Sequence, residues 1–165
     1  MTNQSDLEDV TAHNLRSLKK LERAIAMSQG QFSLILACCT CQPLRQQVVN
    51  QLQKSSSIPI EIFTLPPSVN TLFTSMLASL EAPLPPALMI FGLESVVAID
   101  RVLSATNLMR DEFRKQFPFP VVLWINDEIL QKLIRQAPDL KSWAANPIRF
   151  EVPKHQSLER IAISA

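Results

Sequence analysis

The fold is decided by a short apolar run, Pro120-Val-Val-Leu-Trp-Ile125, which is followed at once by Asn126-Asp127-Glu128. An apolar run of this length without polar alternation is typical of a β-strand that is buried on both faces. Asn126 or Asp127 can act as an N-cap, so a helix is expected from 128 to 136. The stretch therefore predicts a buried strand that leads directly into a helix.

The same pattern recurs on both sides of this stretch. Further strands are expected at residues 32–38, 59–65, 87–91 and, more weakly, 147–152. Helices are expected at about 6–28, 43–54, from a cap at Ser68 onward, 97–116 and 157–165, and an aromatic-anchored turn at 137–143. Leu15 belongs to the apolar stripe expected on the first of these helices, and Leu108 to the stripe expected over 97–116. Alternating strands and helices predict right-handed βαβ units.

We therefore predict a single α/β domain over residues 1–165, with its core at about 30–153. Its architecture is expected to be three-layered: a mostly parallel five-stranded sheet is flanked by helices, and an amphipathic helix precedes it. Docking of this N-terminal helix onto its own sheet is favoured over its use in self-association. Ligands of such sheets lie at the carboxyl ends of the strands, so candidate chemistry is sought there.

The composition narrows the classes of partner and compartment. Hydrophobic residues make up 47% of the chain and the formal net charge is +1, so no field of one sign favours nucleic acid or an anionic membrane. The sequence shows neither a signal peptide nor an apolar run long enough for a bilayer. The three cysteines cluster at Cys38, Cys39 and Cys41, which suits a reducing cytoplasm. Cys38 and Cys39 are expected to point to opposite faces and to fill the core, so no metal site is predicted.

The loop after the first strand lacks the features of a phosphate-binding loop. A phosphate loop has the pattern G-x-x-x-x-G-K-[ST], whereas this loop contains neither glycine nor lysine, and Pro43 removes a backbone donor. Arg45 is expected to be a solvated surface residue. No Ser/His/Asp arrangement or carboxylate pair stands out elsewhere, so no catalytic residue and no cofactor are predicted.

Two other strand-end residues, Glu94 and Asn126, have two interpretations each. Glu94 follows the third strand, where a nucleotide hydrolase holds Mg²⁺, but a role at the start of the following helix is at least as favoured. Asn126 follows the fourth strand, where a phosphate sensor can lie, but the N-cap role is favoured. A nucleotide site, if present, would draw on Thr40, Arg45, Glu94 and Asn126, with Arg101 as another arginine that could replace the lysine.

The order of elements resembles the P-loop NTPase fold over roughly residues 30–153. More narrowly it resembles the NTPase-like domain of STAND-type bacterial signalling proteins, notably cyanobacterial ones that continue into tetratricopeptide or WD repeats. Two segments carry the resemblance: Ala87-Leu-Met-Ile-Phe-Gly-Leu-Glu-Ser95 and, most distinctively, residues 120–143. In intact members the first-strand loop binds the triphosphate and an acid after the third strand binds Mg²⁺; only Glu94 lies at a matching place. The resemblance implies regulated assembly through protein–protein contact.

The favoured interpretation is therefore a non-catalytic interaction or signalling module with a degenerate NTPase-like fold. It would bind protein partners, with self-association as one form, and would act in the cytoplasm. The alternative is an atypical nucleotide-binding domain or weak NTPase that uses Glu94 and an arginine. A receiver-like domain is disfavoured, because Cys38-Cys39-Thr40 and Gly92-Leu93 stand where that fold needs acidic residues.

Overall fold

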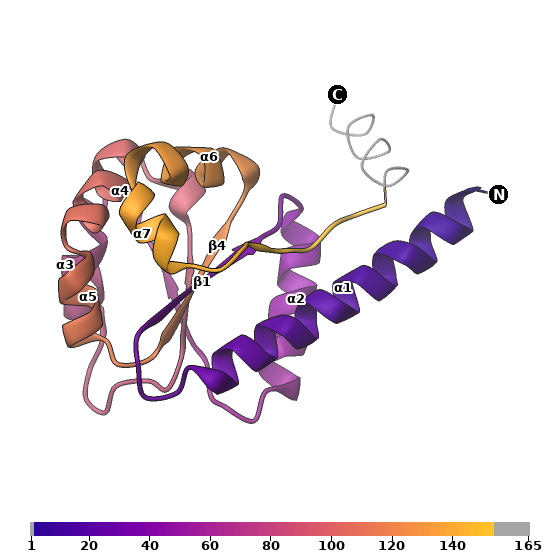
Figure 1. Ribbon diagram of the computed structural model, residues 1–165, viewed down its shortest axis with the longest axis horizontal. Coiled ribbons are helices and arrows are strands. Elements are labelled where there is room, and N and C mark those ends of the chain that lie inside the picture. The colour runs from indigo at the N-terminus through magenta and orange to yellow at the C-terminus, as the bar shows by residue number, and fades with distance from the viewer. Residues whose placement is uncertain (1, 154–165) are drawn as a thin grey trace.

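A five-stranded, all-parallel sheet with helices on both faces forms the body of the protein (Figure 1). The computed structural model describes residues 2–153. The strands are β1 (Ser33–Cys38), β2 (Glu61–Thr64), β3 (Leu88–Phe91), β4 (Pro120–Ile125) and β5 (Ile148–Arg149), in the spatial order β2-β3-β4-β1-β5. The helices are α1 (Thr2–Met27), α2 (Gln42–Ser55), α3 (Leu72–Ser79), the 3₁₀ turn η1 (Leu93–Ser95), α4 (Ile99–Leu108), α5 (Arg110–Gln116), α6 (Asp127–Gln136) and α7 (Pro138–Trp143).

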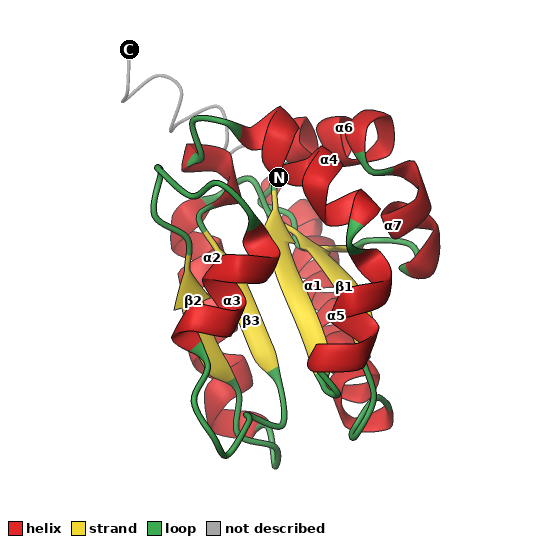
Figure 2. Cartoon of the chain, turned by 90° about the vertical axis from the view of Figure 1, so that its left-hand side faces the viewer, coloured by secondary structure: helices red, strands yellow, loops and turns green. Residues whose placement is uncertain are grey.

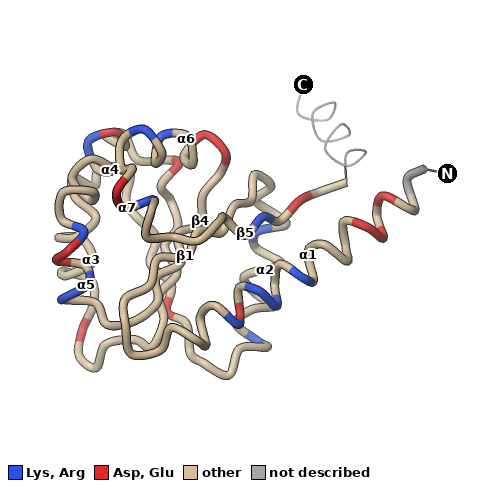
Figure 3. Tube along the Cα trace, viewed as in Figure 1, with Lys and Arg blue, Asp and Glu red and all other residues tan. Residues whose placement is uncertain are grey.

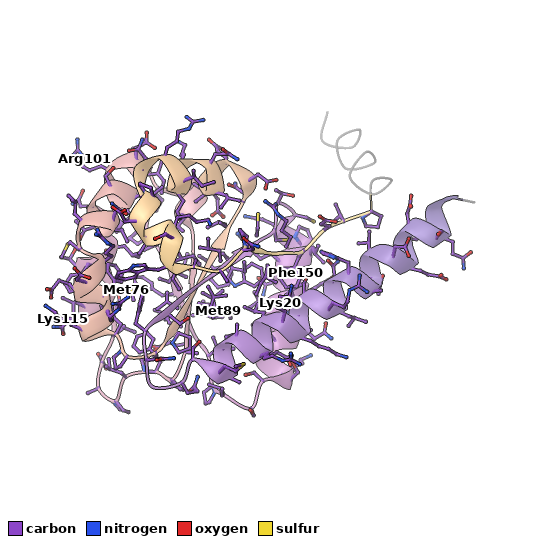
Figure 4. All side chains as sticks on the ribbon, in the orientation of Figure 1. Lys20, Met76, Met89, Arg101, Lys115 and Phe150 are labelled. Carbon is purple, nitrogen blue, oxygen red and sulfur yellow. The ribbon has the colours of Figure 1, made fainter. Side chains whose placement is uncertain are left out.

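The helices divide unequally between the two faces of the sheet. Residues of α1 and α2 share one buried cluster with sheet residues such as Met89 and Trp124. Residues of α3 to α7 share the other cluster with sheet residues such as Ile90 and Leu123. Figure 2 shows this three-layer arrangement, and Figure 4 places Met76 and Met89 in the interior while Arg101 and Lys115 point outward. The predicted α/β class and three-layer architecture are confirmed.

The central pair of strands, β1 and β4, carries the deepest packing. All six residues of β4 are buried, and its register pairs Ser33 with Pro120 through to Cys38 with Ile125. The ring of Trp124 stacks on Phe91 with 6.1 Å between centroids and lies 5.6 Å from the ring of Phe150. Its indole N–H donates to the sulfur of Met89 at 3.3 Å, so the polar atom of this buried side chain has a partner.

Helix α1 docks on its own sheet, as the sequence predicts, and it lies at the β5 edge. Leu21 and Ile25 are fully buried, whereas Leu15 of the expected apolar stripe is 48% exposed. The Oγ of Ser17 donates to the carbonyl of Arg149 at 2.7 Å, and Asn14 exchanges two hydrogen bonds with the backbone of Glu151. In the part of the chain that the structure describes, no helix has the length and apolarity needed to cross a bilayer.

Several predicted elements differ in extent from the observed ones. The helix predicted over 97–116 is two helices that meet at Met109, and Leu108 of the predicted apolar stripe is 81% exposed. The cap predicted at Ser68 is wrong, because Thr71 accepts the N–H of Thr74 and α3 begins at Leu72. The turn predicted at 137–143 contains helix α7, which begins at Pro138 because proline is favoured in a first helical turn. The helix predicted at 157–165 lies outside the described residues.

Gly92 connects β3 to η1 and is held in a conformation that a side chain would strain. Its φ is +93°, and a Cβ at this position would lie 2.9 Å from the carbonyl oxygen of Leu65. Gly30 has a similar φ of +81°, but a Cβ there would meet nothing within 4 Å. An alanine at either position would strain the backbone, but only an alanine at position 92 would also collide with a neighbouring atom.

We expect Gly30→Ala to lower the free energy of unfolding by about 1 kcal/mol, the cost of left-handed backbone for an L-residue. Gly92→Ala should cost clearly more, since the β2–α3 connection must also move away. Urea denaturation of both variants measures the difference. Equal losses would show that the contact with Leu65 carries no energetic weight.

Candidate functional site at the carboxyl ends of the strands

The strand order places a topological switch point between β1 and β4. The chain leaves β1 into α2 on one face of the sheet and leaves the neighbouring strand β4 into α6 on the other face. In open α/β sheets a crevice at such a point is the usual ligand site. Two hollows flank this point at the carboxyl ends of the strands.

The first hollow has a volume of about 600 Å³ and lies between α2, β2 and the end of β3. Its walls combine amide and hydroxyl groups, apolar side chains and one pair of opposite charges. The lining residues are Gln42, Pro43, Arg45, Gln46, Val49, Ile62, Thr64, Phe91, Gly92, Glu94 and Ser95.

Arg45 and Glu94 form an ion pair in this hollow. The Nη1 of Arg45 donates to Oε1 of Glu94 at 3.1 Å, and the two side chains are only 14% and 23% exposed. The guanidinium also lies 5.5 Å from the ring centroid of Phe91. The expectation of a solvated Arg45 is wrong, because the first turn of α2 directs this side chain over the end of β3. The other carboxylate oxygen, Oε2, is buried without a hydrogen-bond partner among the described residues.

The second hollow, of about 350 Å³, lies between the ends of β1, β4 and β5. Here Arg149 donates to Asp127 at 2.8 Å and approaches the sulfur of Cys38 at 3.6 Å. Thr40 lines the same hollow. The hydrogen bond from Arg149 lowers the pKa of the Asp127 carboxyl and raises the pKa of the guanidinium. The charges in this hollow are therefore paired as well.

Burial and, after it, the nearby negative charge of Asp127 raise the pKa of the Cys38 thiol to about 11, although the positive charge of Arg149 opposes them. Burial also raises the pKa of Cys39. The two thiols are buried in opposite clusters, as the sequence predicts. Within residues 2–153, no group of three or more His, Cys, Asp or Glu side chains gathers as metal ligands.

The predicted site residues do not form one constellation. Arg45 and Glu94 meet in the first hollow and Thr40 lies in the second. Asn126 caps α6, since its Oδ1 accepts the N–H of Ile129 at 2.8 Å, which confirms the favoured interpretation of this residue. Arg101 is exposed, lines neither hollow and points outward from the molecule (Figure 4).

Sequence reasoning overlooked the Asp127–Arg149 pair. The sequence indicates Asp127 only as an alternative N-cap of the following helix, and Arg149 lies on the weakest predicted strand. The signal was available in principle, because a last parallel strand that pairs beside the first brings its charged residue to the end of β1. However, only the strand order shows that β5 lies beside β1, and the sequence does not give that order.

The β1–α2 connection offers little to a phosphate. Cys39, Thr40 and Cys41 are its only residues, and α2 then begins with Gln42 and Pro43 and has no side-chain cap. A phosphate cradle needs a longer loop whose backbone N–H groups converge, usually through glycine. The arrangement therefore resembles a tight strand–helix turn and lacks a cradle.

The Arg45–Glu94 pair is expected to stabilise the fold measurably. A double-mutant cycle with Arg45→Met and Glu94→Gln should give a coupling free energy of about 1 kcal/mol, because both groups are largely withdrawn from water. The matched control is Lys115→Met with Glu112→Gln, a pair separated by 3.6 Å whose side chains are 69% and 46% exposed. Its coupling should be close to zero. Equal coupling free energies in the two cycles would contradict a stabilising role for the Arg45–Glu94 pair.

Alkylation should discriminate between the cysteines. With a pKa of about 11, only about a thousandth of Cys38 is thiolate at pH 8, so iodoacetamide should label the partly exposed Cys41 well before Cys38. Asp127→Asn removes a charge that raises this pKa and should therefore speed the labelling of Cys38. Peptide mapping by mass spectrometry gives the order. Prior labelling of Cys38 in the folded protein would contradict the geometry.

Comparison with known proteins gives no relative at a significant level: no family model, no curated protein and no solved structure matches the chain.

Proposed function

We propose that the chain is a non-catalytic protein–protein interaction or signalling module built on a degenerate NTPase-like fold. The observation that carries the proposal is the pairing of charge at the strand ends. Arg45 is neutralised by Glu94, and Arg149 is neutralised by Asp127. A phosphate or a Mg²⁺ ion would have to break one of these pairs, and the loop after β1 supplies no cradle in exchange.

The resemblance to STAND-type domains supports the same role. In those proteins the domain serves regulated assembly, and such a role can persist after the nucleotide is lost. Action in the cytoplasm is part of the proposal, because a reducing compartment suits the buried thiols of Cys38 and Cys39. Figure 3 shows charges of both signs along α1 and over the helices, as expected for solvated faces.

A second candidate function is an atypical nucleotide site. It is favoured by one observation, which is that Arg45 and Glu94 line a single hollow of about 600 Å³. In that function Arg45 would turn from Glu94 to a phosphate, and the carboxylate released would hold the metal. The two functions predict opposite results in a binding experiment.

Isothermal titration of the purified protein with ATP and with GTP, each with Mg²⁺, should give no saturable heat, and neither nucleotide should raise the melting temperature. Saturable micromolar binding that is lost in Glu94→Gln would overturn the proposal in favour of the nucleotide site. The positive counterpart is affinity capture from an extract of the source cells. We expect a partner whose capture is competed by excess untagged protein.

A further inference from the structure

The two edges of the sheet differ in whether their outward backbone groups have hydrogen-bond partners. At the β5 edge the outward backbone groups are those of Arg149 and Glu151, because the N–H of Phe150 donates inward to Cys38 at 2.9 Å. Side chains of α1 form hydrogen bonds with these groups. The hydroxyl of Ser17 donates to the carbonyl of Arg149, and the amide of Asn14 both donates to the carbonyl of Glu151 and accepts from its N–H. This edge is sealed within the chain.

The β2 edge remains open. The N–H groups of Glu61 and Leu65 donate inward to Ala87 and Phe91, at 3.0 and 2.8 Å. Since successive residues of a strand alternate, the backbone groups of Ile62 and Thr64 point outward. No other residue within 2–153 pairs with them, and no described strand lies beyond β2 (Figure 2). Before β2, the side-chain amide of Gln53 donates to the carbonyl of Ile60 at 3.4 Å. The stretch of edge without hydrogen-bond partners is therefore short.

The open edge adjoins the 600 Å³ hollow. Ile62 and Thr64 line the hollow on the sheet side, and Gln42 and Gln46 line it on the α2 side. The side chain of Ile62 is 44% exposed there. An edge strand beside a helix-walled groove is the arrangement in which an extended peptide adds to a sheet and places alternate side chains in the groove. Native proteins commonly protect open edges with charged side chains, above all lysine, or with proline. β2 contains neither lysine nor proline, and its one charged residue is Glu61 at its first position.

We propose that the β2 edge and its groove bind an extended, uncharged segment of a partner protein as a sixth strand. This inference rests on the proposed interaction function and names its surface. The segment would pair its backbone with Ile62 and Thr64 and would pack an apolar side chain against Ile62. It would be uncharged because the groove presents amides and a neutralised pair, Arg45 with Glu94, and therefore no net charge.

A peptide segment fits this surface better than a second copy of the chain. Two open edges of this length would bury far less than the roughly 1,000 Å² that a stable dimer requires. A separate segment gains the walls of the groove in addition to the edge. The groove volume of about 600 Å³ lies within the range of well-formed binding pockets.

The test uses a phage-displayed library of random decapeptides selected on the whole chain. Selected peptides, measured by fluorescence polarisation, should bind Ile62→Lys and Ile62→Pro at least about ten-fold more weakly, because a charge or a missing donor blocks strand addition. The matched control is Ile134→Lys, since Ile134 of α6 is a similarly exposed isoleucine, at 46%, outside the groove. It should leave the affinity unchanged. Hydrogen exchange at Ile62 and Thr64 should slow when peptide is bound.

Failure of this inference is distinguishable from failure of the proposed function. The edge assignment is overturned if no peptide is selected, or if selected peptides bind wild type and Ile62→Lys equally. A dimer by sedimentation that Ile62→Lys abolishes would also overturn it, in favour of a second copy. A captured partner that binds the Ile62 variants as well as wild type would retain the interaction function and remove only this surface. Nucleotide binding would overturn the function itself.

Discussion

The structure depends on the pairing of β1 with β4. Both strands are almost wholly buried, and each contributes alternate residues to the two apolar clusters that hold the helices in place. Because β1 and β4 are adjacent but send their chains to opposite faces, this one pairing also creates the switch point and orders the strand ends around it. Trp124 ties the pair to both neighbours, by stacking near Phe91 of β3 and packing on Phe150 after β5.

The same arrangement explains why the charged side chains at the strand ends are paired with each other. Glu94 stands at the end of β3, where an acid would hold a metal in a hydrolase, and Asp127 stands at the end of β4. Here each acid meets an arginine brought by a neighbouring element, Arg45 from the start of α2 and Arg149 from β5. The Arg45–Glu94 pair satisfies largely buried charge within the chain, whereas the side chains of Arg149 and Asp127 are 43% and 63% exposed. A ligand must then offer more than it displaces, which favours a protein surface over a phosphate site.

The fold could be predicted from the sequence because the buried strands appear there as uninterrupted apolar runs. The run 120–125 appears as a strand with the predicted bounds, and Asn126, one of the two residues predicted as the cap, is the cap observed. The differences arise where local signals compete with tertiary contacts. Leu15 and Leu108 fit helical apolar stripes but are 48% and 81% exposed, because no layer covers those turns. The site was less predictable, since the pairing of Arg45 with Glu94 and of Asp127 with Arg149 requires the strand order, which periodicity does not contain.

The contrast between the two sheet edges links the fold to the proposed role. Parallel sheets of this size expose one strand at each side, and an exposed backbone ladder is a liability unless it is short or covered. The chain uses α1 to cover β5, with polar side chains placed to match the outward groups of residues 149 and 151. Among residues 2–153 no equivalent element covers β2, although α2 lies close enough for the side chain of Gln53 to donate to the carbonyl of Ile60. Within residues 2–153 the β2 edge is open beside a groove, whereas Asn14 and Ser17 cover the β5 edge, and this difference is best explained if the β2 edge binds another chain.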